Sequence, residues 1–126
     1  MSPTGSATAG GIFEVEQAGD TLIIVLVVNL RELDYERIEE GAATILDLLN
    51  NTAIQNVVMD FRKTDYYGST ALAFFVKLWL RVRKQNGRMV FCNVSDHGKD
   101  ILQITQLDHL WPICSSRMEA LQAVSK

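Results

Sequence analysis

Three short apolar runs, separated by stretches of helical periodicity, constrain the fold of this chain most strongly. The runs cover residues 22–28, 54–61 and 88–94 and are rich in Val and Ile. Each run is long enough for a strand and too short for a typical helix. Because strands that alternate with helices usually join through right-handed crossovers, the pattern predicts an α/β fold with parallel strands.

An amphipathic segment precedes the first of these runs. Residues 12–16 alternate apolar and charged side chains, which is typical of a strand with one face in water, and a turn at residues 18–20 follows. We therefore predict an antiparallel hairpin whose second strand, residues 22–28, is central and covered on both faces. The expected fold is a mixed, mostly parallel sheet opened by an N-terminal β-hairpin, with about four helices in the order β-β-α-β-α-β-α-β-α.

Residues with capping and terminating chemistry bound the first two predicted helices. Asp34 is a suitable N-cap for the first helix, whose apolar stripe continues to Leu49. The second helix is predicted over residues 69–85, with Ser69 as its capping residue. Gly87 is expected to end this helix in the left-handed conformation.

Similar signals bound the C-terminal elements. Ser95 is predicted to cap a short helix over residues 96–104, and residues 110–113 indicate a strand. Pro112 lacks a backbone donor, so this strand is expected at a sheet edge. The sequence Ser116-Arg117-Met118-Glu119 fits a capping box for a last helix that buries three apolar side chains, those of Met118, Leu121 and Val124.

Length and composition set the class of protein. A chain of 126 residues suits one domain, expected over residues 11–126, and residues 1–10 are predicted to be a flexible tail without the pattern of a signal peptide. The net charge of −3 argues against nucleic acid as a partner. No apolar run approaches the roughly 20 residues that span a bilayer, so we expect a cytoplasmic protein without membrane insertion.

The sequence lacks the motifs of common enzymes. It contains no GxxxxGK[ST], GxGxxG or GxSxG pattern, which argues against phosphate-loop, dinucleotide and serine-nucleophile chemistry. Asp60 and Asp65 are poor candidates for a catalytic pair of carboxylates, because Asp60 ends a buried strand and Asp65 follows in a loop. We therefore predict no catalytic residues and no cofactor.

The histidines and cysteines do not form a metal-binding pattern. His97 and His109 have no carboxylate or cysteine at ligand spacing, and we expect them at the surface or at helix ends. Cys92 and Cys114 each lie in an apolar run, where a cysteine usually behaves as a small buried hydrophobe. We predict two buried thiols and no metal site.

The segment over residues 57–72 is the best candidate for a functional site. It is predicted to form a buried strand, a loop and a helix that opens at Ser69, followed by Thr70. The first N–H groups of a helix lack intrahelical partners and favour negative charge, phosphate included. Ser69 is therefore an N-cap, part of a site for a phosphorylated ligand, or itself a site of phosphorylation.

Aromatic residues surround this hydroxyl pair. Tyr66 and Tyr67 either wedge the loop against the core, which we favour, or stack on a ligand. The helical wheel places Phe74 on the polar face near Lys77, with Leu78 one turn later, so that Phe74 is expected either in an exposed contact surface or beneath a neighbouring element.

The same residues resemble the STAS domains, the family of bacterial anti-sigma-factor antagonists. The resemblance extends from Ile12 to Val124 and is most specific at Asp60, which ends a strand, and at Gly68-Ser69-Thr70-Ala71-Leu72, which matches the family signature. Gly68 and Ala71 stand where the family usually has Asp and Gly. Residues 88–95 and 105–108 match a later strand and helix of the family.

The resemblance implies a regulatory role. In such proteins a serine kinase that also serves as the anti-sigma factor phosphorylates the first hydroxyl of the signature, which is Ser69 here, with Thr70 as the alternative. A metal-dependent phosphatase reverses the reaction, and the unphosphorylated domain binds the anti-sigma factor. The expected partner surface comprises seven residues around this hydroxyl: Tyr66, Tyr67, Gly68, Ser69, Thr70, Phe74 and Lys77.

Two other functions remain open at this point. The first is a constitutive STAS scaffold in a stress-signalling or lipid-transport complex, which Gly68 and an exposed Phe74 would favour. The second is a nucleotide-binding α/β domain that uses the start of the second helix as its phosphate site.

Overall fold

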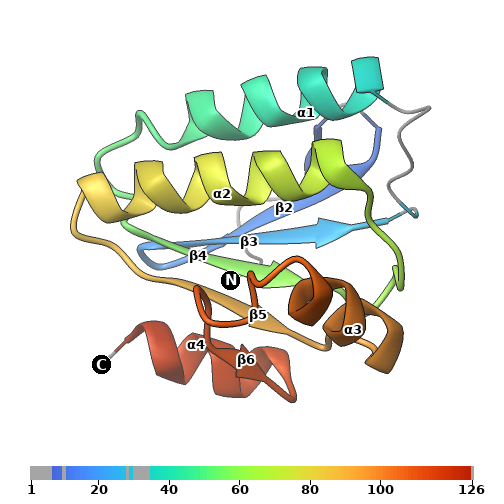
Figure 1. Cartoon of the computed structure of the whole chain (residues 1–126). Coiled ribbons are helices and arrows are strands. Elements are labelled where there is room, and N and C mark those ends of the chain that lie inside the picture. Colours follow the sequence, from blue (N-terminus) through green and yellow to red (C-terminus); the bar gives the residue numbers. More distant parts are fainter. Residues whose placement is uncertain (1–6, 10, 28, 30–34, 126) are drawn as a thin grey trace.

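The computed structural model describes residues 7–9, 11–27, 29 and 35–125. Within these residues one sheet contains six strands in sequential order. Its antiparallel part comprises β1 (Ala7–Ala9), β2 (Phe13–Ala18) and β3 (Thr21–Leu26), and its parallel part continues through β4 (Asn56–Asp60), β5 (Met89–Cys92) and β6 (Ile113–Cys114). The predicted mixed sheet with an N-terminal hairpin is confirmed (Figure 1).

Helices cover both faces of this sheet. On one face α1 (Tyr35–Leu48) and α2 (Ser69–Lys84) lie side by side, and α4 (Arg117–Val124) lies on the other (Figure 1). The short α3 (Asp96–Ile104) packs beside the edge at which β4 and β5 end (Figure 1). Because each crossover returns the chain through a helix, the loops after the parallel strands gather at one edge of the sheet.

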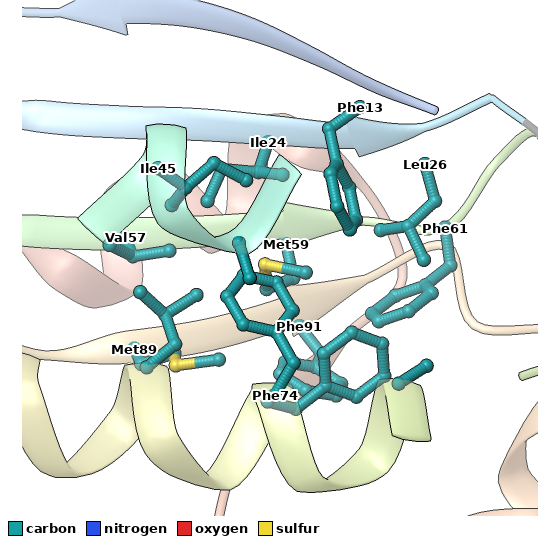
Figure 2. Packing of buried hydrophobic residues seen from close by; sticks show 14 of the residues in the cluster. Phe13, Ile24, Leu26, Ile45, Val57, Met59, Phe61, Phe74, Met89 and Phe91 are labelled. Carbon is teal, nitrogen blue, oxygen red and sulfur yellow. The ribbon is translucent and has the colours of Figure 1, made fainter. Parts of the chain in front are cut away.

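The main core fills the space between the sheet and the pair α1 and α2. Ile45 of α1 and Phe74 of α2 meet strand residues there, including Met59 and Phe91 (Figure 2). A smaller core lies under α4, where Ala120 and Val124 cover residues of β3, β4 and β5. Every residue of β3 is buried, as predicted for a central strand covered on both faces.

The caps of α3 and α4 follow the sequence. The Ser95 hydroxyl accepts a hydrogen bond from the N–H of Gly98 at 3.0 Å, and the Ser116 hydroxyl accepts one from the N–H of Glu119 at 3.2 Å. The reciprocal half of the predicted capping box is displaced by one residue, because the Glu119 carboxylate accepts from the N–H and hydroxyl of Ser115. The predicted C-terminal strand is confirmed at the sheet edge as β6, but it covers Ile113–Cys114 and begins just after Pro112. Asp34 lies outside the described residues.

The sequence pattern missed an edge strand, and its prediction for the residue that ends α2 is wrong by one position. Ala7–Ala9, the described part of the predicted N-terminal tail, pairs with β2, because backbone hydrogen bonds alone can add a strand of small residues. Asn86, with φ of 60°, takes the left-handed position expected for Gly87. Gly87 is required for another reason: a Cβ at this position would lie 1.8 Å from the carbonyl oxygen of Gln55.

The structure decides one open alternative about side-chain burial and shows one prediction to be wrong. Phe74 and Leu78 lie beneath a neighbouring element, the second of the two alternatives for Phe74. They are 5% and 0% exposed, because α1 packs alongside α2 and covers this face. Met118, expected inside, is 71% exposed, while Ala120 and Val124 form the buried face of α4.

Replacing Phe74 tests this arrangement of the two helices. We expect Phe74→Ala to lower the free energy of unfolding by about 3 to 5 kcal/mol, because a buried aromatic ring is lost and leaves a cavity. Leu80→Ala on the same helix is the matched control, since Leu80 is 54% exposed. Leu80→Ala should change the free energy of unfolding by no more than about 0.5 kcal/mol. Urea denaturation measures both, and equal small losses would contradict the packing described.

Candidate functional site

The N-terminus of α2 presents the predicted hydroxyl pair. Gly68, in an extended conformation, is the N-cap, and its carbonyl accepts the N–H of Leu72 at 3.0 Å. The prediction that Ser69 is the capping residue is therefore wrong by one position. Ser69 is the first residue of the helix and is exposed, whereas Thr70 is half-buried. This position leaves the Ser69 side chain accessible at the end of the helix that favours negative charge.

Tyr67 fixes the chain immediately before this helix. Its ring is buried against Phe61 and Phe75, with ring centroids 5.3 and 5.5 Å away. Its hydroxyl donates a 2.8 Å hydrogen bond to the carbonyl oxygen of Gly98 in α3. Burial raises the pKa of Tyr67, so the hydroxyl stays protonated and remains a donor. Tyr67 therefore has the wedge role that we favoured from the sequence.

Asn29 orders the middle of the loop between β4 and α2. Its side-chain oxygen accepts the Thr64 hydroxyl at 2.6 Å and the N–H of Asp65 at 3.1 Å. Thr64 is buried, so this contact ties the loop to the chain that follows β3. The path from β4 to Ser69 is thus held by contacts with two other segments, namely the Asn29 side chain after β3 and the Gly98 carbonyl of α3.

A buried carboxylate, that of Asp60, sets the beginning of the same loop. Asp60 ends β4 with no solvent exposure. One oxygen accepts the N–H of Arg62 and the side-chain amide of Asn93, both at 3.0 Å, and the other accepts Nε of Arg117 at 3.0 Å. Asn93, which donates to Asp60 just after β5, has a φ of 57°. Asn tolerates this left-handed conformation better than most residues do.

Arg117 extends this network to β2 along the face of the sheet that α4 covers. It begins α4, and its Nη1 atom lies 2.9 Å from the carboxylate of Glu16 in β2. Burial by itself lowers the pKa of Arg117, but the hydrogen bonds to Glu16 and Asp60 outweigh this effect and raise it. Sequence reasoning missed this cluster, because Arg117 is 57 residues from Asp60 and 101 from Glu16 and no local pattern signals such pairs.

A groove of about 350 Å³ begins beside Ser69 and lies between α1 and α2. Its apolar part includes Ile38, Ala42 and Phe74, and its polar part includes one carboxylate and one ammonium group. The complete lining is Ile38, Glu39, Ala42, Ser69, Thr70, Ala73, Phe74 and Lys77.

The structure brings four of the seven predicted partner-surface residues together at this groove, namely Ser69, Thr70, Phe74 and Lys77. Phe74 contributes from a buried position, and Lys77 is exposed. The remaining three lie outside the groove lining. Tyr67 and Gly68 are buried, and Tyr66 is 36% exposed and lies opposite His97, with the two ring centroids 6.2 Å apart.

A second hollow, of about 370 Å³, opens at the edge where the parallel strands end. It is lined mainly by polar side chains of the loops that follow β3, β4 and β5. These residues are Asn29, Phe61, Arg62, Lys63, Thr64, Asp65, Asn93 and Ser95.

Other site types find no support within the described part of the chain. No group of three or more His, Cys, Asp or Glu side chains there is arranged to hold a metal ion, and His97 and His109 are both exposed. Among the same residues, no helix has the length and apolar character needed to span a membrane.

Comparison with known proteins defines the family. The sequence model of the STAS domain family matches residues 13–120, which include the sheet from β2 onward and the start of α2. The chain therefore belongs to the STAS domain family.

A curated relative agrees with this family. BtrV of Bordetella bronchiseptica, assigned as an anti-sigma factor antagonist, is 26% identical over 69 residues, or 55% of this chain. The match spans 60% of the length of BtrV.

Solved structures share the fold. An anti-sigma-factor antagonist (STAS) domain protein from Planctomyces limnophilus has 24% identity and a TM-score of 0.75, over 90% of this chain and 98% of that one. The anti-sigma factor antagonist SpoIIAA in its unphosphorylated form has 21% sequence identity and a TM-score of 0.76, and the match covers 90% of this chain and 96% of SpoIIAA. SpoIIAA of Bacillus in the phosphorylated form has 19% sequence identity and a TM-score of 0.65, and the match covers 89% of this chain and 98% of that one.

Removing Arg117 tests the network below the loop. We expect Arg117→Met to lower the free energy of unfolding by about 3 to 5 kcal/mol, because it leaves the Asp60 carboxylate buried without its cationic partner. Lys63→Met is the matched control, since Lys63 and Glu14 form an exposed ion pair at 3.4 Å. That pair should contribute less than about 1 kcal/mol. Thermal or urea denaturation measures both, and an Arg117→Met loss no larger than the control would contradict this role.

Proposed function

We propose that this chain is a non-catalytic regulatory module that binds an anti-sigma factor in the cytoplasm and is switched by phosphorylation of Ser69. The observation that carries the proposal is the position of Ser69. It is exposed, it begins α2, and it lines the groove between α1 and α2. A phosphate added there would change the groove without entering the core.

The groove has the chemistry of a protein contact. Its apolar part can take a hydrophobic side chain of a partner, and Glu39 and Lys77 can orient the partner through charge. Tyr66, which is partly exposed on the loop before α2, extends the proposed surface. Thr70 remains the alternative site of modification, and its half-buried side chain makes it the poorer substrate.

The physical effect of phosphate on Ser69 follows from its position. The modification adds about −1.5 to −2 charges at a helix N-terminus, where the macrodipole favours them, so the fold should persist. Binding should change instead, because the partner would then meet this charge or have to desolvate it. A cost of about 3 kcal/mol corresponds to roughly 100-fold weaker binding.

Family membership supports the choice of partner. BtrV is assigned as an anti-sigma factor antagonist, and SpoIIAA, which shares the fold, is known in both unphosphorylated and phosphorylated forms. By this similarity the partner of the present chain is an anti-sigma factor that is also a serine kinase. A phosphatase would restore the binding-competent form.

A nucleotide-binding role is the second candidate, favoured by the polar hollow at the end of the parallel strands. Arg62 and Lys63 could contact phosphate there, and Asn93 and Ser95 offer polar groups for a base or sugar. Calorimetric titration with ATP and GTP at millimolar concentration tests this role, and the absence of binding heat would exclude it. The alternative of a constitutive scaffold rested on Gly68 and on an exposed Phe74. Only Gly68 still favours it, because Phe74 is buried.

The phosphorylation site can be mapped directly. We expect the purified chain, incubated with ATP and the anti-sigma serine kinase of the same genome, to gain one phosphate on the tryptic peptide Thr64–Lys77. Ser69→Ala should abolish the modification because it removes the accepting oxygen, whereas Thr70→Ala should retain it. Fragmentation mass spectrometry assigns the residue. An unmodified peptide, or phosphate on Tyr66 or Tyr67, would contradict the proposal.

A further inference from the structure

The two cysteines face each other across neighbouring strands. Cys92 ends β5 and Cys114 ends β6, and the two residues are direct register partners in the parallel pair. Both thiols are unbonded in the structure. Local sequence patterns do not indicate this pairing, because the register of β6 is set by the long connection through α3.

The geometry brings both thiols to the same side of the sheet. Cys92 belongs to the buried apolar cluster beneath α4, and the partly buried Cys114 packs against this cluster. Neighbouring strands lie about 4.8 Å apart, and disulfides typically join Cα atoms separated by roughly 4.4 to 6.8 Å. β6 has only two residues and lies at the sheet edge, so it can move the short distance that brings the two Cβ atoms into bonding range.

We propose that Cys92 and Cys114 are a modification site at which a hydroperoxide produces a reversible intramolecular disulfide. Cys114 reacts first, because it is partly exposed whereas Cys92 is buried. Its sulfur attacks one peroxide oxygen, so that an S–O bond forms and the O–O bond breaks. The product is a sulfenic acid, and the departing oxygen takes up the thiol proton and leaves as water or an alcohol.

The second step closes the disulfide. The sulfur of Cys92 attacks the sulfenic sulfur of Cys114, an S–S bond forms, and the S–O bond breaks. The displaced hydroxide takes the proton of Cys92 and leaves as water. The two thiols have together lost two electrons and two protons, and the peroxide has been reduced. A thiol reductant reverses the change.

The local environment makes this reaction slow. Burial raises the pKa of Cys92 to about 12, with a smaller contribution from the charge of Asp60. Burial and Glu119 also raise the pKa of Cys114. Since the thiolate is the nucleophile, sustained exposure to oxidant is needed, which distinguishes this pair from the activated cysteine of a peroxide-consuming enzyme.

The disulfide would act on the network that holds the loop before Ser69. Asp60 and Cys92 are register partners, so Asp60, Cys92 and Cys114 form one row across β4, β5 and β6. Cys114 also lies three residues before Arg117, which binds Asp60. A covalent link in this row would restrain the start of α4 over the buried carboxylate.

Peptide mapping tests the proposal. The reduced, folded chain is treated with hydrogen peroxide, remaining thiols are alkylated in denaturant, and the chain is digested with trypsin without reduction. Cys92 lies in peptide Met89–Lys99 and Cys114 in peptide Asp100–Arg117. We expect these peptides to be joined within one monomer, at a mass two hydrogens below their sum, and to separate after treatment with dithiothreitol.

Two variants serve as controls. Cys92→Ser and Cys114→Ser should each abolish the cross-link, and Cys114→Ser should leave Cys92 available for alkylation after unfolding. The proposal is overturned if both thiols of the unsubstituted chain remain alkylatable after peroxide treatment. It is equally overturned if Cys114 proceeds to sulfinic acid while Cys92 stays reduced, or if the cross-links join two chains.

Discussion

The buried charge of Asp60 is the interaction on which the arrangement of the site depends. A carboxylate without solvent exposure is costly unless it is paired and fully hydrogen-bonded. The donors come from the start of the β4–α2 loop, from Asn93 after β5 and from Arg117 on α4. One side chain therefore fixes the exit of β4 relative to the end of β5 and to α4. Tyr67 then fixes the end of the same loop through α3.

This arrangement distinguishes an anchored loop before α2 from the exposed Ser69 side chain that follows it. The loop before α2 is anchored by Asp60, Asn29 and Tyr67, whereas Ser69 remains exposed at the groove. A phosphate on Ser69 would meet a helix N-terminus that tolerates it, so the anchored loop need not rearrange. The proposed switch is therefore a change in surface charge on a fixed scaffold.

Local sequence patterns predicted the parts of the fold that depend on local chemistry. The element order follows from the alternation of apolar runs and helical periods, and Ser95 and Ser116 cap the helices as expected. Contacts between distant elements left no such signal. Periodicity placed Phe74 on a polar face because it cannot tell that α1 covers this side of α2. The Asp60–Arg117 pair and the register of Cys92 with Cys114 likewise depend on tertiary structure.

The proposed switch at Ser69 is tested most directly by the affinity of one partner for two forms of this chain. Isothermal titration would compare binding of the anti-sigma factor to the unmodified chain and to the chain phosphorylated on Ser69. Thr52→Asp is the charge control, because Thr52 is exposed in the connection between α1 and β4, away from the groove. We expect roughly 100-fold weaker binding after phosphorylation and little change for the control. Equal affinity of the two forms would contradict the proposed switch.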